Sequence, residues 1–156
     1  MKELKLKRVQ GGAEIVEFAV ILPLLLLVMF GVIEFGLVFY DKALITNASR
    51  EAARSGTAYK CPVLTTQQIT DVVTHYTADA GGNSFLVSFA GGSALPSVTV
   101  TQQIPPTTCG ANSGTWLNVT VTYNYQFLVF GNLFSLFAPG FTNPLSLTAT
   151  TVMNYE

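Results

Sequence analysis

Three small residues near the start of this chain form a candidate site at which the chain could be cleaved. Gly11, Gly12 and Ala13 follow a basic stub and precede a long apolar run. A secretory signal has the opposite order, because its small-residue site follows the apolar core. Cleavage beside Gly12 would therefore remove only the basic stub and leave the apolar run on the mature protein.

Two acids accompany the apolar run. Glu17 stands at its start and Glu34 lies inside it. A carboxylate close to hydrocarbon costs free energy, so a partner is expected for Glu17. For Glu17 that partner is the amine that cleavage would create at Ala13, in the same chain or in a neighbouring subunit; alternatively, Glu17 lies at the headgroup level and needs none. For Glu34, a helix–helix or subunit contact is one interpretation.

The apolar run is long enough to span a membrane. From Phe18 to Tyr40 there are 23 residues, and a helix of that length covers about 34 Å, against a hydrocarbon core of about 30 Å. Its 16 Leu, Ile, Val and Phe residues together favour insertion by roughly 5 to 10 kcal/mol, which exceeds the penalty of about 3 kcal/mol for one acid. The basic stub before the run predicts a cytoplasmic N-terminus.

The remaining residues argue against catalysis and nucleic-acid binding. Asp71, Asp79 and Glu156 are the charged residues of segment 61–156, so this part offers no basic surface for nucleic acid. No nucleophile, acid pair or phosphate-binding loop forms a catalytic pattern. The single histidine, His75, is interpreted as a surface residue. We expect no enzyme activity, no cofactor and no metal site.

The chain has two cysteines, Cys61 and Cys109. If residues after Tyr40 are exported, an oxidising compartment favours a disulfide between them, worth roughly 4 kcal/mol at most in the chain-entropy model. The alternative is two buried free thiols, which a cytosolic domain would favour. Two cysteines and one histidine supply too few ligands for a metal site.

The order of basic leader, Gly12, Ala13, Glu17 and Phe18 is that of a type IV prepilin. In addition to this leader order, three segments resemble the TadE-like pseudopilins of the tight adherence (Tad) pilus machinery: GAEIVEFAVILPLLLLVMFGVIEFGLVFY, ALITNASREAARSGTA and the C-terminal LSLTATTVMNYE. The resemblance implies that a membrane prepilin peptidase cuts after Gly12. It also implies that Glu17 and Phe18 then serve in recognition and filament entry, with other pilins, pseudopilins and Tad assembly proteins as partners.

We expect a pilin-like α+β fold with an antiparallel sheet of three to four strands. The predicted domains are a leader at 1–12, a long helix at 13–56 that spans the membrane at about 18–40, and an exported domain at 57–156. A second helix is predicted at 66–80. Alternation or apolar character predicts strands at 85–89, 97–104, 116–125 and 145–153.

The Phe-rich segment 127–141 has two interpretations. It is either a loop or short helix folded over the sheet, or an exposed apolar patch that contacts a partner or the outer leaflet of the inner membrane. Two functions follow for the chain. The first is a minor pseudopilin of the bacterial inner membrane, single-pass, with a cytoplasmic N-terminus and a periplasmic C-terminal domain. The second is an uncleaved, single-span periplasmic binding module.

Overall fold

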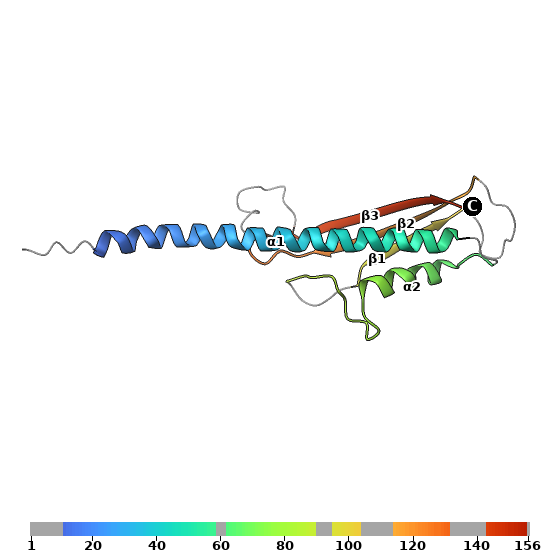
Figure 1. Cartoon of the computed structure of the whole chain (residues 1–156), viewed down its shortest axis with the longest axis horizontal. Helices are drawn as coiled ribbons and strands as arrows, with labels where there is room; N and C mark the ends of the chain where they lie inside the picture. The colour runs from blue at the N-terminus through green and yellow to red at the C-terminus, as the bar shows by residue number, and fades with distance from the viewer. Residues whose placement is uncertain (1–10, 59–61, 90–94, 104–113, 132–142, 156) are drawn as a thin grey trace, which may run out of the picture.

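The fold consists of one long helix, one short helix and a three-stranded sheet (Figure 1). A computed structural model describes residues 11–58, 62–89, 95–103, 114–131 and 143–155. Within these ranges the elements are α1 (Gly11–Thr57), α2 (Thr66–Thr77), β1 (Ser97–Gln102), β2 (Trp116–Tyr125) and β3 (Leu145–Asn154). The predicted α+β class with a long N-terminal helix, a second short helix and an antiparallel sheet is confirmed.

Helix α1 divides into a free half and a packed half. It contains 47 residues and continues through Pro23, which gives a length of about 70 Å. Its first half projects beyond the rest of the molecule (Figure 1). The apolar side chains from Ile15 to Phe30 are exposed or partly exposed. By length and composition, α1 is able to cross a membrane.

The packed half of α1 buries one stripe against the sheet. Val38, Ile45, Ala48 and Ala52 recur at helical spacing and are buried. They join a core whose largest contribution from the sheet is the inner face of β2. Ala48 and Ala52 are small, which allows the helix to lie close to the strands. The second half of α1 is therefore a core element of the domain as well as a continuation of the apolar half.

Gly56 was predicted to end this helix, but α1 continues to Thr57. A Cβ at Gly56 would lie 2.5 Å from Leu117 Cδ2 and 3.0 Å from Ile69 Cδ1. Both distances are shorter than ordinary van der Waals contact. A larger residue at position 56 would therefore force the Leu117 side chain of β2, and to a lesser extent the Ile69 side chain of α2, to move.

Helix α2 begins with a capping box. The Thr65 hydroxyl accepts a hydrogen bond from the Gln68 N–H at 3.3 Å, and Gln68 Oε1 accepts one from the Thr65 N–H at 2.9 Å. Ile69 and Val73 are buried on the predicted stripe. The helix ends at Thr77 rather than at Ala80, because Ala78 already has extended backbone angles.

The sheet has the order β1-β2-β3 and is antiparallel throughout. Alternate residues of β2 are buried from Leu117 to Tyr125, as the alternation predicts. Helix α1 covers β2 and β3, and α2 packs beside β1. On the opposite face, threonine hydroxyls pair across strands, with Thr120 to Thr150 at 3.1 Å and Thr122 to Thr148 at 3.4 Å.

The predicted strand at 85–89 is not formed. The Val87 N–H donates to a side-chain oxygen of Asp41 at 3.0 Å, and the Phe89 N–H points to the Gln126 carbonyl at 3.5 Å. The backbone of this segment therefore bonds to separate elements and follows no single neighbouring strand. Apolar composition alone did not distinguish such a covering loop from a short strand.

Candidate functional site

The predicted processing segment lies in the free half of α1. Gly12 is exposed, and nothing lies within 4 Å of the position that a Cβ would occupy there. Ala13 lies in the first turn of the helix, and residues 1–10 are outside the described residues. Glu17 is exposed, and Phe18 is 63% exposed. Gly12, Glu17 and Phe18 are therefore accessible to another molecule.

Glu34 has a partner within the chain that the sequence did not reveal. Its side chain is buried, and its carboxylate accepts hydrogen bonds from three successive backbone N–H groups. The N···O distances are 2.9 Å for Leu128, 2.6 Å for Val129 and 3.2 Å for Phe130. This carboxylate thus holds the start of a turn that enters helical geometry at Phe130. A helix–helix or subunit contact by Glu34 stays a prediction.

Aromatic rings pack around the turn that Glu34 holds. The Phe35 ring lies with its centroid 6.5 Å from that of Phe127 and 6.0 Å from that of Phe130. Tyr125 and Phe127 form a second edge contact at 5.0 Å. A Cβ at Gly31 would lie 2.8 Å from the Phe130 ring. Residues 127–131 of the Phe-rich segment therefore fold onto α1, while 132–142 lie outside the described residues.

A second buried acid, Asp41, follows two turns after Glu34 on the same face of α1. It lies beyond the expected span, and its Oδ1 accepts the N–H of Val87 at 3.0 Å. Burial raises the pKa of Asp41 to about 6, and the Val87 hydrogen bond only partly opposes this shift. Asp41 Oδ2 is buried without a hydrogen-bond partner among the described residues. Burial and then the charge of Asp41 raise the pKa of the nearby Tyr123 hydroxyl, and the Ser88 side chain opposes this shift.

Glu34 and Asp41 together fasten two separate loops to α1. Glu34 holds the turn after β2, and Asp41 holds the loop before β1. Both acids also influence Tyr125, whose pKa is raised to about 12, first by burial and then by the charges of Glu34 and Asp41. The Tyr125 hydroxyl donates to the Glu34 carbonyl oxygen at 3.4 Å. Among the described residues, the two buried acids therefore both lie where α1 enters the domain.

The other predicted site residues lie elsewhere. His75 is exposed on α2, as predicted. Cys61 and Cys109 lie outside the described residues, so their pairing stays a prediction. Among the residues that the structure describes, no cluster of three His, Cys, Asp or Glu side chains forms a candidate metal site.

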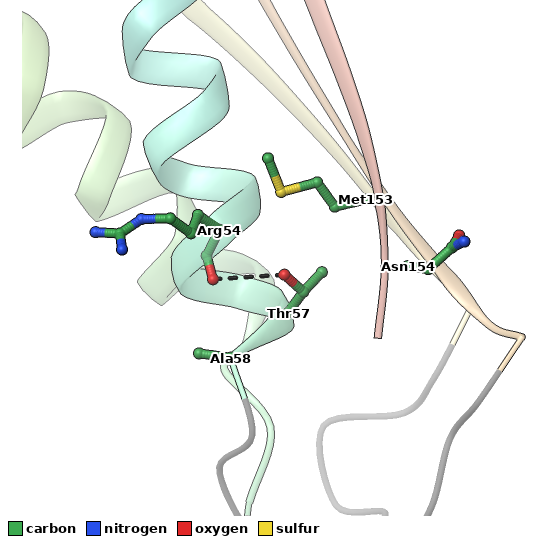
Figure 2. Close-up of a pocket in the computed structure, with 5 residues that line it drawn as sticks. All are labelled: Arg54, Thr57, Ala58, Met153 and Asn154. Atoms are coloured by element: carbon green, nitrogen blue, oxygen red, sulfur yellow. Dashed lines mark hydrogen bonds between the residues drawn. The ribbon is translucent and has the colours of Figure 1, made fainter. Parts of the chain in front are cut away.

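An open pocket of about 410 Å³ lies at the far end of α1, where the helix ends beside β3. Its lining residues are Arg54, Thr57, Ala58, Met153 and Asn154. The Arg54 side chain extends away from Met153 and Asn154 (Figure 2), and its guanidinium pairs with Glu51 at 2.9 Å. The Thr57 hydroxyl donates to backbone carbonyls of the helix. Both side chains thus already have partners within α1.

The fold defines a class of protein: a chain with one long apolar helix, able by length and composition to cross a membrane, whose second half packs on an antiparallel sheet. Residues 12–54 match the family model described as TadE-like protein, so the N-terminal segment of this chain is TadE-like. The matched segment contains Gly12, Glu17 and Glu34, and the resemblance inferred from the sequence is confirmed over it. The comparisons with curated proteins and with solved structures found no match.

Proposed function

We propose that this chain is a minor pseudopilin that is processed by a prepilin peptidase and assists assembly of a Tad-type adhesive pilus. The observation that carries the proposal is the TadE-like match over residues 12–54. This segment contains the small-residue junction, Glu17 and the free apolar half of the helix. The proposed partners are the peptidase, other pilins or pseudopilins and Tad assembly proteins.

The geometry of α1 supports an anchor in the bacterial inner membrane. The helix is free of the domain from Gly12 to Phe30, a length of about 28 Å, which is close to the thickness of a hydrocarbon core. Gly31 is the first buried residue of α1, and the domain begins to cover the helix there. The basic leader orients the N-terminus to the cytoplasm, so the domain lies in the periplasm.

Exposure at the start of α1 supports a role for Glu17 after processing. Cleavage between Gly12 and Ala13 creates an amine four residues before Glu17, about one helical turn away. Within the described residues, Glu17 has no hydrogen-bond or ion-pair partner. A carboxylate in this position is stabilised by an amine, either its own or that of a neighbouring subunit. Glu17 therefore links processing to entry into a filament.

The alternative, an uncleaved periplasmic binding module, has weaker support. Its natural site would be the pocket at the far end of α1, but Arg54 and Thr57 are already bonded within the helix. A ligand site normally presents convergent polar groups in an apolar hollow. The pocket lacks that arrangement at these two residues, so the pseudopilin proposal is preferred.

Complementation in the native host tests the assembly role. Cells lacking this chain are expected to lose surface pili, as seen by electron microscopy and in sheared filament fractions, and the unaltered chain restores them. Glu17→Gln is expected to be produced and processed but to restore few pili. Glu14→Gln, a change at another exposed acid of the same helix end, serves as the matched control. Normal piliation in cells without the chain would refute the proposal.

A further inference from the structure

An exposed apolar surface, which we call the collar, lies on α1 and on two neighbouring loops where the helix enters the domain. We define the collar by six exposed side chains from three segments: Val32, Phe35, Phe39, Tyr40, Phe89 and Leu128. Val32 and Phe39 are more than 70% exposed, and Leu128 is 53% exposed. Four of the six are aromatic, which is a large amount of aromatic surface to leave in water.

The collar is continuous with the free apolar half of the helix and carries no exposed charge. The segments 84–89 and 124–131 contain no Asp, Glu, Lys or Arg. In segment 31–41 of α1 the two acids, Glu34 and Asp41, are both buried. Lys42 is the first exposed charged residue beyond the collar. The boundary between apolar and charged surface therefore lies at about residue 41 and not at Phe30, where the domain begins.

Glu34 removes the main obstacle to placing the collar in lipid. A turn normally exposes backbone N–H groups, and each costs several kcal/mol when it is taken from water without a partner. At this turn the N–H groups of residues 128–130 all donate to the Glu34 carboxylate. The acid and the three donors satisfy one another, and the side chains of the turn, Leu128, Val129 and Phe130, are all apolar.

We propose that the collar lies in the outer leaflet of the membrane that α1 spans, with its aromatic rings at the boundary between acyl chains and headgroups. This inference rests on the membrane anchoring in the proposed function. It adds how deeply the end of the domain nearest the membrane enters the bilayer. Aromatic side chains favour that boundary. The span and the collar then cover about 43 Å of helix from Gly12 to Tyr40, close to the full thickness of a bilayer with its interfacial regions.

Fluorescence quenching by brominated lipid tests the collar directly. The full chain, with Trp116→Phe as background, is reconstituted into phosphatidylethanolamine and phosphatidylglycerol vesicles that contain phosphatidylcholine brominated near the headgroup end or the middle of its acyl chains. Leu128→Trp reports on the collar. Val152→Trp is the matched control, because Val152 is 57% exposed but lies on β3 away from the membrane end. Val20→Trp reports on the span.

The proposal predicts that Leu128→Trp emission falls by roughly half with bromine near the headgroup end, as for a ring about 5 to 10 Å below the headgroups. Val152→Trp emission is expected to be unchanged, and Val20→Trp is expected to respond most to bromine at mid-chain. Quenching of Val20→Trp without quenching of Leu128→Trp would overturn the collar and leave the anchor intact; the collar surface would then be available to a neighbouring subunit. Absence of quenching at both positions would overturn the anchor as well.

Discussion

Replacing Glu34 with glutamine tests whether one carboxylate holds the turn after β2. In Glu34→Gln the shape of the side chain is retained but its charge is lost. The Leu128 and Val129 N–H groups both reach Oε1, and the Phe130 N–H reaches Oε2. A glutamine can satisfy the first two with its carbonyl oxygen. Its NH₂ group would then face the Phe130 N–H, so that two donors oppose each other.

The magnitude follows from the hydrogen bonds that change. Bonds to a charged acceptor contribute about 1.5 to 3 kcal/mol each and bonds to a neutral acceptor about 0.5 to 1.5 kcal/mol. Because the three bonds share one group and are not additive, we expect a local loss of about 2 kcal/mol. That loss corresponds to an increase of roughly thirty-fold in the opening of the turn.

Hydrogen–deuterium exchange of the full chain in lipid vesicles measures this opening. Peptides covering residues 125–131 are expected to exchange roughly thirty-fold faster in Glu34→Gln, while β2 outside the turn keeps its protection. Glu51→Gln is the matched control, since Glu51 lies on the same helix and binds exposed Arg54 instead of backbone. Unchanged exchange in Glu34→Gln, or equal acceleration in Glu51→Gln, would refute the role given to Glu34.

Three further predictions follow. Gly31→Ala places a Cβ 2.8 Å from the Phe130 ring, whereas a Cβ at Gly36 meets nothing within 4 Å. We expect Gly31→Ala to weaken the exchange protection of the turn after β2 by about 1 to 3 kcal/mol and Gly36→Ala to leave it unchanged. Equal effects of the two substitutions would contradict the packing argument. The pKa of Asp41 is raised to about 6 from 3.8, so the folded state holds this proton more tightly than the unfolded state. The contribution of Asp41 to stability therefore falls as pH rises from about 4 to 6 and does not change further above that pH. Asp41→Asn is expected to remove this pH dependence and to stabilise the domain at pH 7 by up to about 3 kcal/mol. Thermal unfolding of both proteins at several pH values measures the effect, and an unaltered pH dependence would contradict the raised pKa of Asp41. Cys61 and Cys109 are expected to pair in protein from the periplasmic side, and two free thiols in a non-reducing mass measurement would exclude the disulfide.

Much of the fold could be predicted because its elements depend on local patterns. The alternation from Leu117 to Tyr125 predicts a strand with one buried face, and that face is buried. The absence of proline and internal glycine after Tyr40 predicts that the helix continues beyond the span, and it continues to Thr57. The predicted ends of the helices were less accurate: α1 continues one residue past Gly56, and α2 ends at Thr77 because the backbone is already extended at Ala78.

The partners of the buried acids could not be predicted, because they come from segments distant in the sequence. Glu34 bonds to residues more than 90 positions away, and its three donors are backbone N–H groups, which every non-proline residue has. No residue type in the Phe-rich segment signals such a contact. Two hints were available: a lone acid in an apolar run requires a partner, and Asp41 follows it by seven residues on the same helical face.

The mass of the chain before and after exposure to its peptidase tests the central claim most directly. With an active prepilin peptidase, intact mass and N-terminal sequencing are expected to show a product that begins at Ala13 and remains in the membrane fraction. A catalytically inactive peptidase is the control, and with it the chain is expected to keep its leader. A product that retains the leader with the active peptidase, or one that is cut after the apolar run and released from the membrane, would contradict the account.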